Sequence, residues 1–223
     1  PDLSMESTDQ TNTVLSGIMT YNRVFGDHGV DFLIGMERDW SDAESFNGYR
    51  RYFLSTALHH FNAGGDKEKN AKSDGDNWER ARMNYFGRFA YNYKEKYLAE
   101  FVWRYDGSYM FAAGERFGFF PGVLLGYRIS EEDFWKENLS FINYFKLRAS
   151  WGQMGNDQVY YDDKLREYQF APTYYYEWGY IIDNADEKGL HISRFPNPAI
   201  SWERANNFNV GIDFAVLKNR LSG

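Results

Sequence analysis

Alternation of apolar and polar residues with a period of two recurs along this chain and constrains its fold more than any other feature. Successive side chains of a β-strand point to opposite faces of a sheet, so each such stretch predicts a strand with one apolar and one polar face. The stretch at 13–24 alternates less cleanly than the others. The sequence therefore predicts an all-β fold with seven strands, near residues 13–24, 30–40, 82–93, 97–107, 116–129, 144–153 and 202–214.

The two faces of these strands differ in chemistry. One face is expected to form an outward apolar band that includes Phe89, Tyr91, Phe101, Trp103, Leu125, Phe208 and Ile212. The other is expected to face a lumen and to include Arg88, Glu100, Arg104, Asp106, Arg128 and Arg148. Ladders of ion pairs are the expected role of these charged residues, with contact to a plug or to substrate as the alternative. A wall that is apolar outside and polar inside is typical of membrane-spanning β-barrels.

The lengths of the connections add independent information. Short turns are expected at 25–29, 94–96 and 215–219, and long loops at 41–81 and 154–201, with an intermediate one at 107–115. Along the chain, short and long links alternate. The exception is 130–143, where we expect a helical turn at the short-loop end. Outer-membrane barrels have short periplasmic turns and long extracellular loops, so this sorting favours such a barrel over a soluble β-sandwich.

Seven strands and the stub of an eighth are too few to close a barrel with a wide lumen. The sequence therefore predicts a partial transmembrane antiparallel β-barrel, an open curved sheet with long extracellular loops. Residues 1–10 lack the apolar core of a signal peptide, and the chain stops just after a turn, so we expect residues 1–223 to be a fragment of the barrel domain.

Composition excludes several classes of function. A net charge of -7 argues against binding to nucleic acid, which requires a basic surface. The absence of cysteine excludes disulfides and thiol chemistry. Aromatic residues make up 20% of the chain, yet its mean hydropathy is -0.66. Abundant rings together with abundant charge suit a two-faced membrane wall.

Five sequence blocks, in the right order, resemble the SusC/RagA family of TonB-dependent transporters. They are 82–93, 97–108 with its Arg-x-Asp-Gly-Ser ending, 116–132 with Arg-Ile-Ser-Glu-Glu, 147–156, and 197–204 through 217–223. Tyr127 stands where the family usually has Trp, which is a departure from its pattern.

This resemblance implies a TonB-dependent importer of glycan or peptide fragments, a multi-pass β-barrel in the outer membrane that contacts its lipid. A SusD-like surface lipoprotein would cover it, and TonB would contact an N-terminal part. The family's plug domain is absent from residues 1–223. We expect no enzymatic activity, no cofactor and no metal. The alternative is a soluble β-rich carbohydrate-binding module.

An aromatic cluster in the second long loop is the candidate contact site for substrate or lid. It consists of Tyr174, Tyr175, Tyr176 and Trp178. Exposed rings stack on sugars and contribute rigid area to protein interfaces. The alternative is that these rings pack within the loop or against neighbouring loops.

Other polar clusters have weaker functional interpretations. His59 and His60 are adjacent, so as strand neighbours they would point apart and not bind one metal. The acidic segments 74–79 and 183–187 are expected to be solvated loops, with calcium binding as the alternative. Glu131, Glu132 and Asp133 are consecutive at an expected turn, which does not match two carboxylates facing each other across a cleft.

Overall fold

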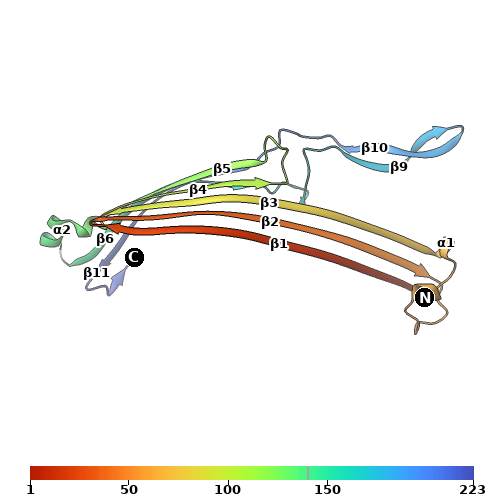
Figure 1. Ribbon diagram of the computed structural model, residues 1–223, viewed down its shortest axis with the longest axis horizontal. Helices are drawn as coiled ribbons and strands as arrows, with labels where there is room; N and C mark the ends of the chain where they lie inside the picture. The colour runs from red at the N-terminus through yellow and green to blue at the C-terminus, as the bar shows by residue number, and fades with distance from the viewer. Residues whose placement is uncertain (140) are drawn as a thin grey trace. The chain divides into compact units, whose positions relative to one another are not determined.

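A computed structural model describes residues 1–139 and 141–223 of the chain. Its main feature is an eight-stranded sheet in the order β1–β2–β3–β4–β5–β6–β11–β12 (Figure 1). Every pairing whose register is described is antiparallel. These strands are β1 (Asp2–Phe25), β2 (His28–Arg51), β3 (Ala71–Tyr93), β4 (Tyr97–Ser108), β5 (Phe117–Arg128), β6 (Ile142–Asn156), β11 (Glu203–Val216) and β12 (Leu221–Ser222).

The remaining elements are short and lie in the connections. Two small hairpins, β7 (Tyr160–Tyr161) with β8 (Lys164–Leu165) and β9 (Thr173–Ile182) with β10 (Ala185–Arg194), occupy the segment between β6 and β11. Helical turns are η1 (Phe61–Ala63), α1 (Lys67–Asn70), η2 (Ile129–Glu131) and α2 (Asp133–Asn138). Among the described residues, no helix has the length and apolar character that crossing a membrane requires. The all-β prediction and the expected helical turn at 130–143 are confirmed.

The chain divides into two compact units. Residues 1–15 and 38–81 form the first, and residues 16–37 and 82–223 form the second, so that β1, β2 and β3 each contribute to both. In the first unit, Arg50 is buried and its guanidinium donates to the carbonyl oxygen of Gly65. Phe53, also buried, lies two residues after the end of β2. These contacts fix the connection between β2 and β3.

The pairing register of the second unit sorts its side chains into two faces, because directly paired residues share a face. One row runs through Phe89, Phe101, Val123, Trp151 and Phe208. By the same register, the seven residues expected in the apolar band lie on this face. The six charged residues from Arg88 to Arg148 lie on the other. That this second face borders a lumen stays a prediction.

Aromatic residues mark both ends of the apolar face. Tyr93, Tyr97 and Tyr127 form a row at the turn end, and the Tyr97 and Tyr127 rings stack with centroids 5.0 Å apart. Tyr85 and Tyr105 pair at the loop end. The two rows are eight residues apart along β3 and β4, or roughly 27 Å at the rise of a β-strand. Transmembrane barrels have aromatic girdles on either side of an apolar band about 25 Å tall.

At two glycines of the apolar face, an aromatic ring from the paired strand packs over the glycine backbone. An added Cβ at Gly87 would lie 2.4 Å from the Trp103 indole nitrogen, and one at Gly107 would lie 2.5 Å from the Phe117 ring. Each glycine is directly paired with the residue whose ring covers it. A side chain at either position would displace that ring.

The predicted bounds were wrong at the loop end of the first three strands. The expected strands 13–24, 30–40 and 82–93 extend to 2–25, 28–51 and 71–93, so the predicted loop 41–81 reduces to a connection at 52–70. Residues 2–12 and 71–81 are mostly polar on both sides and exposed, so they show no apolar alternation. Backbone pairing does not require an apolar face, and the pattern could not reveal it.

Candidate functional site

Ion pairs hold the charged side chains of the polar face. Arg88 Nη2 lies 2.7 Å from Glu100 Oε2 on the neighbouring strand. Arg148 Nε lies 3.0 Å from Asp213 Oδ1 across the β6–β11 pair. Such charge-assisted hydrogen bonds are stronger than neutral ones.

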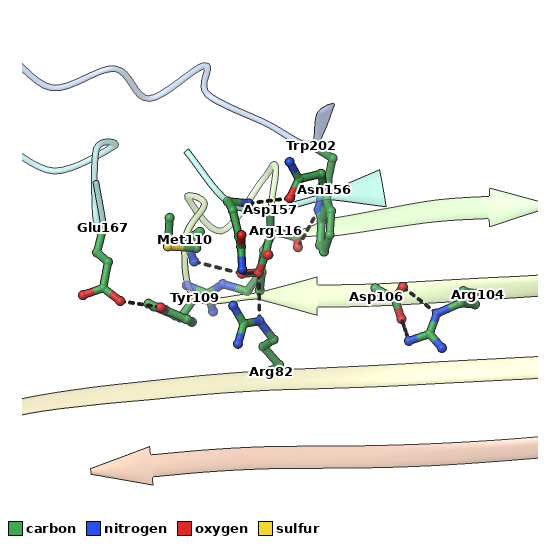
Figure 2. A network of polar contacts seen from close by, with 12 residues as sticks. Arg82, Arg104, Asp106, Tyr109, Met110, Arg116, Asn156, Asp157, Glu167 and Trp202 are labelled. Atoms are coloured by element: carbon green, nitrogen blue, oxygen red, sulfur yellow. Dashed lines mark hydrogen bonds and ion pairs between the residues drawn. The ribbon is translucent and has the colours of Figure 1, made fainter. Parts of the chain in front are cut away.

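Arg104 and Asp106 form a bidentate ion pair on the polar face. Arg104 Nε donates to one oxygen of Asp106 at 2.9 Å, and Nη2 donates to the other at 3.0 Å (Figure 2). Both residues belong to the Arg-x-Asp-Gly-Ser block of β4. Because they are two residues apart on one strand, they share a face and can pair without distorting it.

A hollow of about 330 Å³ lies among the ion pairs of the polar face. Charged groups of both signs line it, together with Asn92, Ser150 and Asn209. Its charged members are Asp31, Arg88, Glu100, Lys146 and Arg148. Leu98 and Leu124 also line it, so the hollow combines charged, polar and aliphatic groups.

The loop end of β4 is closed by a packed polar cluster (Figure 2). Asp157 Oδ2 accepts hydrogen bonds from Arg82 Nε at 2.8 Å and from Ser108 Oγ at 2.7 Å. The Met110 backbone N–H in turn donates to Ser108 Oγ at 3.2 Å. Ser108 is fully buried, as is Phe111. The Asp157 carboxylate, at the start of the long segment after β6, thereby binds β3 and the last residue of β4.

Aromatic packing fixes the other end of that long segment. The Trp202 ring lies 5.3 Å from the Phe111 ring and 5.2 Å from the Phe120 ring, measured between centroids. Its indole N–H donates to the carbonyl oxygen of Arg116 at 3.2 Å (Figure 2). We call the following eight residues the loop-end platform: Arg82, Ser108, Met110, Phe111, Arg116, Phe120, Asp157 and Trp202. The platform holds both ends of segment 157–202.

The candidate aromatic cluster lies on a strand of the β9–β10 hairpin rather than in an irregular loop. Tyr174 and Tyr176 pair with Ile192 and Leu190, whereas Tyr175 pairs with His191 and stacks on it at 5.4 Å. The tyrosines therefore alternate between two faces. Tyr174 and Tyr176 share an exposed apolar face with the two aliphatic residues. The side chain of Trp178 lies outside the described part of the structure.

The acidic segment 183–187 forms the tip of this hairpin. Asp183 and Asn184 both have positive φ, 52° and 61°, which a tight type I′ turn requires and which Asp and Asn tolerate. The dipeptide between two alternating stretches was the signal that the sequence interpretation missed. The other acidic segment, 74–79, lies within β3. In the part of the chain that the structure describes, no three His, Cys, Asp or Glu side chains gather as metal ligands.

A second polar network lies at the turn end. Glu132 accepts hydrogen bonds from Lys96 Nζ and from the hydroxyls of Tyr97 and Tyr127, each at 3.1 Å. The hydrogen bond from Lys96 is the main reason that the pKa of Glu132 is lowered. Glu131 pairs with Lys136 at 2.9 Å, and that hydrogen bond lowers the pKa of Glu131. Glu132 therefore binds the β5–β6 connection to the sheet, whereas the ion pair between Glu131 and Lys136 lies within the connection.

Known proteins resemble the chain along nearly its whole length. It is 28% identical over 220 residues to TonB-dependent receptor P3 of Formosa agariphila, which covers 99% of the chain and 21% of that protein. It is 33% identical over 206 residues to TonB-dependent receptor P39 of the same organism, and the match covers 91% of the chain and 18% of that receptor. TonB-dependent receptor SusC of Bacteroides thetaiotaomicron is 28% identical over 214 residues, and the match covers 80% of the chain and 20% of that receptor. No family model matches the chain.

Solved structures agree on the fold. Two structures of the RagAB peptide importer, one in a "closed-closed" and one in an "open-open" state, match with TM-scores of 0.81. Their sequences are 21% and 22% identical to this chain. The matches cover 98% and 99% of this chain and 23% of each importer chain. The chain thus spans about a fifth of the curated relatives that it matches. By sequence and fold together, it belongs to the TonB-dependent receptors of the SusC/RagA type.

Proposed function

We propose that the chain is part of the barrel wall of a TonB-dependent importer in the outer membrane. The observation that supports this most strongly is the sorting of side chains by the pairing register. The apolar face stays exposed in the second unit, and Phe208 retains 73% of its accessible surface. An exposed apolar face of this extent suits contact with lipid and would be a liability in water. A soluble carbohydrate-binding module would have to cover this face.

In the proposed importer the polar face lines the lumen. Its ion pairs and its mixed-sign hollow suit a cargo rich in hydrogen-bonding groups, such as an oligosaccharide or a peptide. The related proteins are named as receptors and transporters, and the wall proposed here has no catalytic role. A SusD-like surface lipoprotein would act with the barrel outside, and TonB would act through a part of the protein that precedes this chain.

Two neighbouring residues of β5 provide a matched test of the wall in the full-length receptor. Val123 lies on the apolar face and Leu124 on the polar face, with similar exposures of 38% and 41%. Arginine facing lipid near the bilayer midplane costs about 2–4 kcal/mol, whereas the lumen face tolerates charge. We expect Val123→Arg to reduce the amount of folded receptor in the outer membrane and Leu124→Arg to leave it near normal. Equal effects of both would contradict the proposed wall.

We further propose that the β9–β10 hairpin contacts the lid lipoprotein or the cargo. The loop-end platform gives the segment fixed ends, and loops on a rigid scaffold commonly hold binding residues. The face formed by Tyr174, Tyr176, Leu190 and Ile192 offers exposed rings and aliphatic groups. Aromatic side chains are enriched in such interfaces.

The two faces of the hairpin can be tested separately. We expect the double variant Tyr174→Ala/Tyr176→Ala to weaken co-purification of the lipoprotein or uptake of cargo in the full-length receptor. Tyr175→Ala removes one ring of the same size from the face that stacks on His191, and serves as the comparison. If the double variant binds the lipoprotein and imports as well as the unaltered receptor, the hairpin has no such role.

A further inference from the structure

The connection between β5 and β6 folds onto the apolar face of the sheet. Glu132, the residue before α2, accepts hydrogen bonds from the hydroxyls of Tyr97 and Tyr127. Both tyrosines belong to the row that ends the apolar face. Three residues later, the Trp135 ring stacks on Phe145 with centroids 5.0 Å apart and planes inclined by 21°. Phe145 pairs with Phe214 and lies on the apolar face as well.

The same connection keeps two phenylalanines exposed. Phe134, in α2, retains 55% of its accessible surface, and Phe141, just before β6, retains 61%. Phe134 makes an edge contact with Trp135 at 6.5 Å. Between β5 and β6 the chain therefore presents three aromatic side chains, and one of them, Trp135, packs on the apolar face.

The polar groups of the connection are arranged differently. Lys96 and Lys136 form ion pairs with Glu132 and Glu131, so the charges gather around the start of α2. The Trp135 indole N–H also has a partner, since it donates to the carbonyl oxygen of Ile142 at 3.3 Å. An aromatic side with a charged side next to it matches the boundary between lipid acyl chains and headgroups, where Trp and Tyr are enriched.

We infer that the β5–β6 connection is an interfacial anchor, with Phe134, Trp135 and Phe141 seated in the phospholipid leaflet at the turn end of the wall. This inference rests on the proposed membrane wall and extends its aromatic girdle beyond the strands. The occupant is the phospholipid bilayer itself, because Trp135, which contacts Phe134, packs on the face proposed to contact lipid. The anchor would fix the depth of the wall at its periplasmic edge.

Site-directed spin labels test the anchor in the full-length receptor, cleared of other cysteines and reconstituted in vesicles of phosphatidylethanolamine and phosphatidylglycerol. Labels replace Phe134 or Phe141 in the anchor and Phe101 in the middle of the apolar band. A label at Phe195, a phenylalanine that is 83% exposed before β11, is the matched control. The measurement is the collision rate of each label with oxygen, which enters lipid, relative to a water-soluble nickel chelate.

We expect the oxygen-to-nickel ratio at positions 134 and 141 to be several-fold higher than at 195 and lower than at 101. A high ratio at 101 with water-like ratios at both anchor positions would overturn the anchor and leave the membrane wall intact. A water-like ratio at 101 would overturn the proposed wall, and the anchor with it. Two anchor positions are labelled so that a local disturbance at one of them does not decide the result.

Discussion

The two ends of the second unit are built in opposite ways. At the loop end, Phe111 and Ser108 are fully buried and Met110 is 2% exposed, in a cluster that resembles the core of a soluble domain. At the turn end, hydrogen bonds and ion pairs hold a short connection whose phenylalanines stay exposed. The protein itself must therefore order the long loop segment, whereas in the proposed wall the bilayer would cover the turn end.

The largest effect is expected from emptying the loop-end core. Phe111→Ala should cost about 3–5 kcal/mol, because it leaves a cavity in a site with no exposed surface. Hydrogen exchange of the amides at 108–116 in the full-length receptor would measure the free energy of local opening. Phe195→Ala, at an exposed position, is the control. Equal protection in the two variants would show that the loop end has no packed core.

A smaller effect is expected from removing the charge of the platform. Asp157→Asn preserves the size of the side chain but weakens its hydrogen bonds with Arg82 and Ser108. Hydrogen bonds to charged groups contribute about 1.5–3 kcal/mol. Hydrogen exchange of the Met110 backbone amide should therefore be faster in Asp157→Asn than in the unaltered receptor. Asp186→Asn, on the exposed hairpin, is the control and should leave the exchange rate of the Met110 amide unchanged. An unchanged exchange rate in Asp157→Asn would contradict the proposed role of the Asp157 carboxylate.

The turn end should respond to pH. The lowered pKa values of Glu131 and Glu132 mean that these carboxylates stabilise the fold above their ordinary value of 4.5. That stabilisation is lost as the pH falls through their lowered pKa values. Hydrogen exchange of residues 129–139 should therefore accelerate under acid conditions. Glu132→Gln should reduce this pH dependence, whereas Glu137→Gln should not, and identical pH profiles would refute the assignment.

The smallest effect is expected between the two ends, at the Arg88–Glu100 pair. The two side chains are partly exposed, and such pairs contribute about 0.2–1 kcal/mol. A double-mutant cycle with Arg88→Met and Glu100→Gln would measure the coupling from receptor stability in detergent. A coupling as large as the effect of Asp157→Asn would mean that the middle of the wall is held like its loop end.

Sequence reasoning succeeded where an element has two chemically different faces. Residues 97–107 alternate over most of their length, and the observed β4 differs from the expected strand by one residue. The connection at 130–143 was also recognisable, because an acidic and aromatic run interrupts the alternation. Both features depend on neighbours in sequence, which a pattern can reveal.

The loop-end platform could not be predicted in the same way. Asp157, Ser108 and Arg82 are far apart in sequence, and each belongs to a different strand or connection. Trp202 was assigned to a strand, although its ring fills the space beside Phe111 and Phe120. The hairpin at 173–194 was missed because three consecutive tyrosines at 174–176 do not alternate with polar residues, so the segment was interpreted as part of the long loop 154–201. There the Asp183-Asn184 turn was the available signal.

The two covered glycines bear on how such a wall finds its correct strand alignment. A slip of two residues between β3 and β4 would keep every apolar side chain on the apolar face, so polarity alone would not penalise it. It would, however, place Trp103 opposite Tyr85 or Phe89 instead of Gly87. Two bulky rings would then compete for the space that one ring now occupies. Gly87 and Gly107 thus favour the observed pairing register over a two-residue shift, which the alternation of apolar and polar residues alone would allow.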